Sequence, residues 1–267
     1  MIISMSIDNL KKDIGLAVDA LKVNTGYIFN RDLIDKLFEK NSHSFENIYM
    51  RLITIDSLYS TNMSRRLFGI CDLATAIFKI GDDEQIKEQV RKYKSLDEEN
   101  KISKLLNGYY GISKTCDTSE KARSLISKYL YFVTNHDFPI EDSLVKNTLN
   151  KILGYYELLK WNNKEDLLLF LIQFCKENGI AIGDLDNFLW LHGKINKGSL
   201  SLLVEEEDYK TIIERLDVQK EDSTEISNRL RNVDYIKKIS DIISLNLRKI
   251  LELNREIFEK SNNKSKK

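Results

Sequence analysis

The stretch "SLISKYLYFVTNHDFPIEDSLV", residues 124–145, decides the fold. From Leu125 onward its first half is apolar on nearly all sides, which predicts a helix over residues 120–133 that is buried in a core. Pro139 is the only proline of the chain, and it disfavours helix at Phe138. It therefore separates the buried helix from a second helix, predicted over residues 143–154.

The composition supports a helical architecture for the rest of the chain. The 267 residues include one proline and 11 glycines, too few for extensive turn-rich β structure. Apolar residues recur mostly at helical spacing, so the fold class is predicted to be all-α. Further helices are predicted over residues 7–22, 31–40, 45–60, 64–81, 164–178, 184–194 and 206–216, with two short surface helices in 83–106.

The pattern of apolar and charged residues changes after about residue 200. Residues 1–200 are predicted to form a compact all-α core domain, and residues 201–267 a C-terminal helical extension. Apolar residues at three- and four-residue steps predict one long amphipathic helix at about 224–260, continuous or broken once. Such a helix either packs on its own domain or joins two copies of the chain into a homo-oligomer.

The charge balance and the cysteines bear on partners and location. Lys plus Arg and Asp plus Glu both number 41, so binding to nucleic acid would need a local basic patch. No stretch approaches about 18 apolar residues, and no membrane span is expected. Cys71, Cys116 and Cys175 are far apart and odd in number, which is typical of buried thiols in a reducing compartment. A cytoplasmic location is the expectation.

Carboxylates, lysines and hydroxyl groups are the remaining sources of chemistry. The three histidines, His43, His136 and His192, lack the spacing of metal ligands, so no metal site is expected. The glycine-containing segments "IAIGD" (180–184) and "LHGKINKGS" (191–199) lack the spacing of a phosphate-binding loop. No cofactor is expected.

Asp142 is the best placed carboxylate of the sequence. It follows Pro139 at a predicted helix start, where either Asp142 or Ser143 caps the helix. Backbone N–H groups and the positive end of the helix dipole favour its ionised form. An ionised carboxylate there could take a proton from water or stabilise a developing cation. The alternative is that Asp142 is only a helix cap.

Lys128 places a charge in an otherwise apolar helix. Burial of an ammonium group without a counter-charge is costly. Lys128 therefore either extends to the surface along its aliphatic stem or pairs with Asp142 or Glu141. The second alternative predicts an ion pair between the buried helix and the segment after Pro139.

Two segments resemble a known family. "FPIEDSLV" (138–145) resembles the P-V-D-[ST]-H-V element of the helix-hairpin-helix (HhH-GPD) DNA glycosylase superfamily, and "LITIDSLYSTNMSRRL" (52–67) resembles its L-I-x-x-x-L-S-x-Q-x-[ST] segment. The resemblance covers roughly residues 45–155. It implies a compact multi-helix fold of this kind, and a double-stranded DNA substrate from which a flipped base is excised.

The resemblance also implies roles for individual residues. Asp142 corresponds to the catalytic carboxylate, and Lys121 is nearest to the Schiff-base lysine of bifunctional members, with Arg123 and Lys128 as competitors. The implied DNA contacts are Ser60, Thr61 and Asn62 at the base-flipping wedge, Arg65 and Arg66 at phosphates, and Lys114 and Arg123 along a basic groove.

The sequence departs from the family at the hairpin. "YYGISKTCDTSEKA" (109–122) stands where L-P-G-[VI]-G is expected and has neither the proline nor the paired glycines. Two functional hypotheses follow. The chain is either a DNA glycosylase, or an all-α scaffold or interaction protein that lacks the chemistry. The second hypothesis predicts a mixed-charge cleft around Asp142 and an exposed apolar stripe on residues 224–258.

Overall fold

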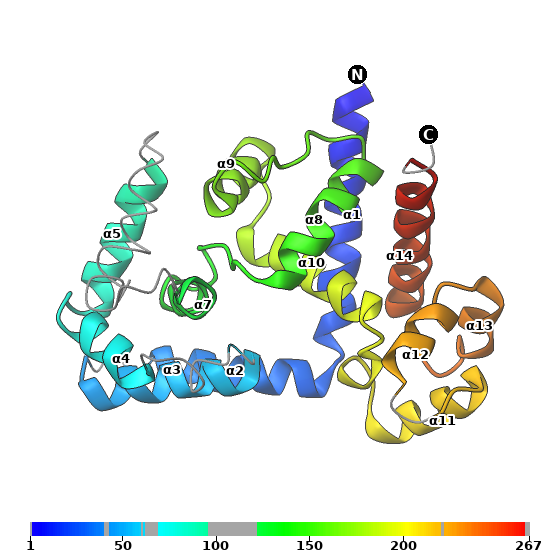
Figure 1. Cartoon of the computed structure of the whole chain (residues 1–267), viewed down its shortest axis with the longest axis horizontal. Helices are drawn as coiled ribbons and strands as arrows, with labels where there is room; N and C mark the ends of the chain where they lie inside the picture. Colours follow the sequence, from blue (N-terminus) through cyan, green and yellow to red (C-terminus); the bar gives the residue numbers. More distant parts are fainter. Residues whose placement is uncertain are drawn as a thin grey trace. The chain divides into compact units, whose positions relative to one another are not determined.

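The structure is a computed structural model that describes residues 2–39, 43–59, 61, 69–95, 122–219 and 222–264. Over these residues it contains helices and connecting loops and no strand (Figure 1), so the predicted all-α class is confirmed. Packing divides the chain into two units. The first unit is Met1–Phe29, Ser143–Asn162 and Asp184–Lys267, and the second is Asn30–Asp142 and Asn163–Gly183. The boundary expected near residue 200 falls inside the first unit.

The second unit is built around helix α7 (Arg123–Val133). Every residue of α7 from Leu125 to Val133 is buried, which confirms the buried helix predicted from the sequence. Helices α3 and α5 both pack against α7, and α4 packs against α3 (Figure 1). The other helices of this unit are α2 (Thr25–Glu39, from Asn30), α3 (Phe45–Tyr59), α4 (Ile70–Phe78), α5 (Asp83–Ser95) and α9 (Leu167–Asn178).

Helix α4 is shorter than the helix predicted over 64–81. It begins after Gly69, whose N–H donates to Asp72 Oδ2 at 3.0 Å, and Ser64, the predicted cap, lies outside the described residues. The prediction that the cysteines are buried is wrong for Cys71, which is exposed on α4, whereas Cys175 is buried. The apolar spacing misled here because α4 packs through Leu73 and its neighbours and turns Cys71 outward.

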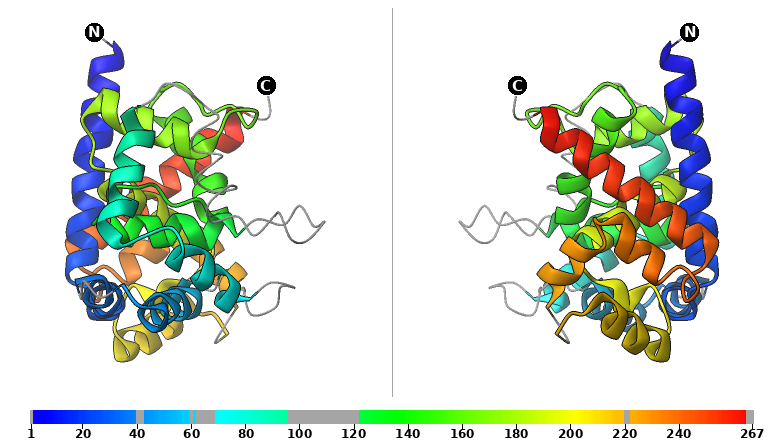
Figure 2. Two further views of the ribbon diagram at one scale, coloured as in Figure 1. Left: turned by 90° about the vertical axis from the view of Figure 1, so that its left-hand side faces the viewer. Right: turned by 90° about the vertical axis from the view of Figure 1, so that its right-hand side faces the viewer.

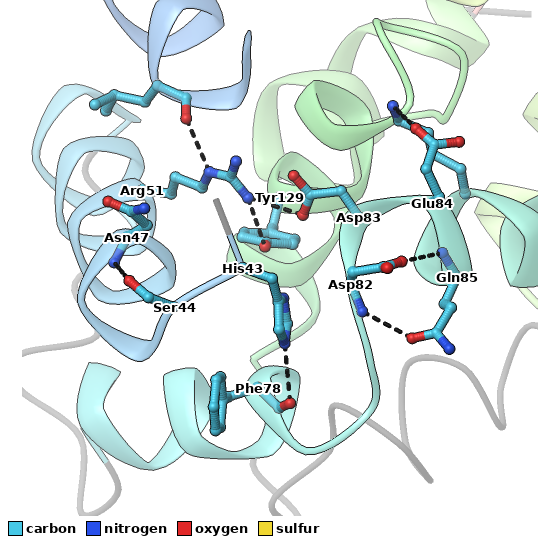
Figure 3. Close-up of polar contacts among 12 residues, drawn as sticks. His43, Ser44, Asn47, Arg51, Phe78, Asp82, Asp83, Glu84, Gln85 and Tyr129 are labelled. Atoms are coloured by element: carbon cyan, nitrogen blue, oxygen red, sulfur yellow. Dashed lines mark hydrogen bonds and ion pairs between the residues drawn. The ribbon is translucent and has the colours of Figure 1, made fainter. Parts of the chain in front are cut away.

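A buried ion pair joins four elements of the second unit (Figure 3). Arg51 on α3 is 0% exposed, and its Nη1 donates to Asp83 Oδ1 on α5 at 2.8 Å. Its Nε donates to the carbonyl of Leu37 on α2, and Nη1 lies 3.5 Å from the hydroxyl of Tyr129 on α7. Burial alone would lower the pKa of Arg51, but the hydrogen bonds and charge interactions with Asp83 and Tyr129 together outweigh it and the pKa is raised. The guanidinium is therefore a fixed cation in the core.

Helix α14 organises the first unit. It packs against α1 and α8, and Figure 2 shows it in red, inclined to α1 in blue. None of the described helices is both long and apolar enough to span a membrane. The helices of this unit are α1 (Ile2–Lys22), α8 (Ser143–Tyr155), α10 (Ile182–Asn196, from Asp184), α11 (Glu206–Leu216), α12 (Ser223–Arg229), α13 (Val233–Lys238) and α14 (Leu245–Lys264).

The single long helix predicted at about 224–260 is wrong. The segment forms α12, α13 and α14, with breaks over 230–232 and 239–244. Asn232 caps α13 by accepting from the N–H of Asp234 at 2.8 Å, and Ser244 Oγ accepts from the N–H of Leu247 at 3.2 Å before α14. Each helix turns its own apolar residues inward, so the spacing continues across the breaks.

The apolar stripe predicted to be exposed on residues 224–258 is buried. Most of its members pack inside the first unit, Val233 is half-buried, and the neighbouring Leu245 is 63% exposed. A homo-oligomer through 224–260 stays a prediction, and it would need a surface other than this stripe. The buried members are Ile226, Leu230, Ile236, Ile239, Ile243, Leu247, Ile250, Leu251 and Ile257.

A polar chain crosses the core of the first unit. Asn254 Nδ2 donates to Asn196 Oδ1 at 3.1 Å, so Asn254 Oδ1 is an acceptor and His192 donates to it from Nδ1 at 2.8 Å. The other ring nitrogen, Nε2 of His192, is buried and makes no hydrogen bond to a described residue. The imidazole is held neutral because burial lowers the pKa of His192 to about 4.

The Arg51–Asp83 pair can be tested by substitution. Asp83→Asn is expected to lower the free energy of unfolding by about 3 kcal/mol, because the buried guanidinium loses the Asp83 carboxylate. Asp82→Asn is the matched control: Asp82 is exposed, and asparagine can still accept the cap hydrogen bond from the Gln85 N–H. Urea unfolding of both variants measures the difference. Equal losses would show that the ion pair does not stabilise this unit.

His192 makes stability depend on pH. The unfolded chain binds a proton on this histidine as the pH falls through about 6.5, while the folded chain does so only near about pH 4. The stability present above pH ~6.5 is therefore lost as the pH falls. Between about pH 7 and pH 5 the wild type should lose about 2 kcal/mol more than His192→Gln in urea unfolding. His43→Gln, a half-buried histidine elsewhere, should follow the wild type.

Candidate active site

One face of α7 carries the polar residues of the candidate site. The first of these residues is Arg123, and the others follow it by one, four and five positions: Ser124, Ser127 and Lys128. At this spacing the side chains leave the helix on the same side. This face meets the segment 138–142, which begins with the buried residue Phe138. The segment continues the chain after a turn in which Asn135 and His136 have positive φ angles of 54° and 66°.

Lys128 and Asp142 form the ion pair predicted from the sequence. Lys128 Nζ lies 3.6 Å from Asp142 Oδ2, with the two side chains 2% and 19% exposed. The ammonium also donates to Ser124 Oγ at 2.8 Å and lies 5.5 Å from the centre of the Tyr59 ring. The carboxylate is the more accessible member of the pair.

Arg123 makes a second set of ion pairs beside the first. Its Nε and Nη2 donate to Glu141 Oε2 at 3.0 and 2.7 Å, and Nη2 also donates to Asp166 Oδ2 at 3.0 Å. Burial alone would lower the pKa of Arg123, but the hydrogen bonds and the charges of Glu141 and Asp166 together outweigh it and the pKa is raised. The guanidinium is therefore engaged on two sides, and a DNA phosphate would have to compete with Glu141 and Asp166.

The backbone of the segment is tied to α7 as well. The N–H of Glu141 donates to Ser127 Oγ at 3.0 Å, and the Ser127 hydroxyl donates to the carbonyl of Ser124 at 3.1 Å. Glu141 is 7% exposed. These bonds fix the residue before Asp142, and Asp142 itself directly precedes α8. The carboxylate is thus positioned by main-chain contacts as well as by its own ion pair.

The structure brings together part of the predicted site. Asp142, Lys128, Glu141 and Arg123 lie in one cluster. Thr61 follows α3, where its hydroxyl and its N–H both bond to Asp56. The other predicted residues lie outside the described residues: Lys121, Ser60, Asn62, Arg65, Arg66 and Lys114.

Two members of the cluster were not anticipated from the sequence. Asp166 caps α9 by accepting from the N–H groups of Leu168 and Leu169, and also binds Arg123. Its position before an apolar run signals a cap, but nothing in the sequence relates it to Arg123. Tyr59 approaches Lys128 from the end of α3, and no spacing rule links those two residues either.

The cluster has the composition of an acid–base site. Among the described residues no group of three or more His, Cys, Asp or Glu side chains is arranged to hold a metal ion. Comparison with protein-family models, with curated proteins and with solved structures finds no match to this chain. What the arrangement offers is a positioned, partly accessible carboxylate beside a buried ammonium group.

The Lys128–Asp142 pair should respond asymmetrically to substitution. Asp142→Asn is expected to lower the free energy of unfolding by about 3 kcal/mol, because it removes the carboxylate beside a buried cation. Lys128→Met should cost about 1 kcal/mol, because the aspartate left behind still reaches water. The double variant should be more stable than Asp142→Asn. Urea unfolding near neutral pH measures all three, and strictly additive losses would contradict the coupling.

Proposed function

We propose that the chain is a DNA-binding protein of the base-excision type, which hydrolyses the N-glycosidic bond of a flipped damaged or modified base. The observation that supports this most directly is the Asp142 carboxylate, 19% exposed and 3.6 Å from the Lys128 ammonium. The resemblance of "FPIEDSLV" to the catalytic element of the HhH-GPD superfamily, in an all-α chain, adds a second line of support.

The proposed reaction uses Asp142 in two ways. As the C1′–N bond breaks, its electron pair leaves with the base and positive charge develops on the sugar, which the ionised carboxylate stabilises. Water then attacks C1′, and Asp142 accepts the proton that the water loses. This proton passes to the departing base, which leaves as a neutral molecule, and Asp142 is ionised again. Lys128 holds the carboxylate in place through the ion pair. Its own side chain is only 2% exposed, so we assign it a positioning role.

A lyase step would need an amine as well. The aldehyde of the abasic sugar and a lysine amine would condense to an imine with loss of water, and borohydride reduces such an imine to a stable amine. Lys121 remains the candidate amine of this proposal. The Lys128 ammonium is already engaged by Asp142 and Ser124.

A second candidate function is an all-α scaffold or interaction protein without this chemistry. It is favoured by one observation: Arg123, expected to contact DNA, is engaged by Glu141 and Asp166. Together with Lys128 and Asp142 these residues form a mixed-charge cluster, as this hypothesis predicts. The cluster would then serve only to hold the segment 138–142 against α7.

Base excision on a panel of duplex oligonucleotides separates the two functions. Duplexes that carry uracil, 8-oxoguanine, hypoxanthine or an alkylated purine are incubated with the full chain, and abasic sites are counted after alkaline cleavage. We expect excision of at least one base, and a rate at least about 100-fold lower for Asp142→Asn. Borohydride trapping on abasic DNA, with Lys121→Met as comparison, reports the lyase step.

Two variants control for loss of the fold. Asp32→Asn changes an exposed aspartate of α2 in the same unit and should excise at the wild-type rate. The double variant of Lys128→Met with Asp142→Asn removes both charges together, so it should fold and still be inactive. If the wild type leaves every duplex intact and does not retard abasic DNA in a gel, the glycosylase proposal fails and the scaffold function stands.

A further inference from the structure

A polar pocket of about 500 Å³ lies in the first unit, and none of its lining residues belongs to the candidate active site. It lies between the end of α10 and α12, and we call it the Arg231 pocket. The described residues that line it include two cations and no carboxylate. All of its lining residues are charged or carry a hydroxyl or amide group: Asn196, Lys197, Ser199, Ser223, Thr224, Ser227, Asn228 and Arg231.

The chain segments around this pocket pack closely against each other. Gly198 has a φ of +67°, and a Cβ atom added there would lie 1.9 Å from the carbonyl oxygen of Ser223. Only glycine allows the chain to pass so close to the start of α12. Ser227 Oγ donates to the carbonyl of Asn196 at 2.9 Å, and the Asn196 side chain accepts from the buried Asn254. The pocket is therefore formed before any ligand binds.

Arg231 differs from the other arginines of the first unit. It has no carboxylate within 4.0 Å among the described residues, whereas each of the other four does. Its guanidinium is half-buried, with Cζ 3.8 Å from the centre of the Phe258 ring, and its buried Nε makes no hydrogen bond to a described residue. The four paired arginines are Arg215, Arg229, Arg248 and Arg255.

This environment is unfavourable for a cation unless an anion joins it. Burial lowers the pKa of Arg231, and no neighbouring acid offsets the effect. Within the described part of the chain, Nη1 donates only to the amide oxygen of Asn228, at 3.3 Å. Stacking on Phe258 fixes the plane of the guanidinium, which prepares its fork of donors for an oxyanion. Lys197, an exposed residue, supplies a second positive charge at the same pocket.

We propose that the Arg231 pocket binds a small phosphomonoester, with the phosphate at Arg231 and Lys197. The guanidinium donates to two phosphate oxygens, and the ammonium neutralises the remaining charge. Ser199, Ser223, Thr224 and Asn228 then offer hydroxyl and amide groups to the rest of the ligand, as a sugar requires. The volume is that of a pocket for a nucleotide or a sugar phosphate. The proposal does not rest on the glycosylase function.

Calorimetric titration of the full chain tests the site. The probes are AMP, ribose 5-phosphate and inorganic phosphate, with adenosine and ribose as phosphate-free controls, all at one ionic strength. We expect the two phosphomonoesters to bind, and adenosine and ribose to bind at least about tenfold more weakly. A further probe is a single-stranded DNA oligonucleotide with blocked ends, whose phosphates are all diesters. It tests if the pocket binds a phosphodiester instead of a phosphomonoester.

Substitutions then assign the binding to named residues. Arg231→Gln and Lys197→Gln should each weaken AMP about tenfold. Arg229→Gln is the matched control, because Arg229 is also half-buried and stacked on a ring, that of Tyr235, but is paired with Glu225. It should leave AMP affinity unchanged. Circular dichroism checks that each variant folds. If Arg231→Gln is unfolded, the AMP affinity of Lys197→Gln alone tests the site.

Three results would overturn the proposal. The first is that no phosphate probe binds at concentrations up to about 10 mM. The second is that Lys197→Gln and Arg231→Gln bind AMP as well as the wild type does. The third is that only the oligonucleotide binds, which would assign the pocket to a phosphodiester chain.

Discussion

Helix α7 is buried along its length from Leu125 to Val133, so its polar groups must be satisfied inside the protein. This constraint shapes the second unit. Lys128 requires a counter-charge and finds Asp142, and Ser127 accepts from the backbone of Glu141. Arg123 lies at the end of the same face and donates hydrogen bonds to Glu141 and to Asp166, the residue that caps α9. The course of the segment 138–142 follows from the charges on a buried helix.

The same cluster serves stability and the proposed chemistry, and the two demands differ in what they need from Asp142. Stability needs the carboxylate close to Lys128, and hydrolysis needs it accessible to water and to a sugar. An exposure of 19% at Asp142 against 2% at Lys128 meets both demands in part. Arg51 shows the purely structural case, where guanidinium and carboxylate are both buried and no face remains for a ligand.

Local sequence signals predicted the helices well and their partners poorly. Apolar runs located α7 and α9, and Gly179 ends α9 in the left-handed conformation its sequence position suggests. Spacing could not detect the breaks before α13 and α14, because the apolar period runs through them. Of the site, only the Lys128–Asp142 pair was predictable, because a charged residue on an apolar buried helix needs a counter-charge. Pairs such as Arg123 with Asp166 depend on tertiary packing.

The packing of α1 against α14 has a consequence for synthesis of the chain. These helices stand near opposite ends of the sequence, so α1 leaves the ribosome long before its partner exists. Its apolar face, with Leu10, Ile14 and Leu21, lacks the α14 contacts while the chain between the two helices is translated, an interval of tens of seconds at about 5–20 residues per second. The apolar face of α1 therefore stays without its α14 contacts until α14 has been synthesised.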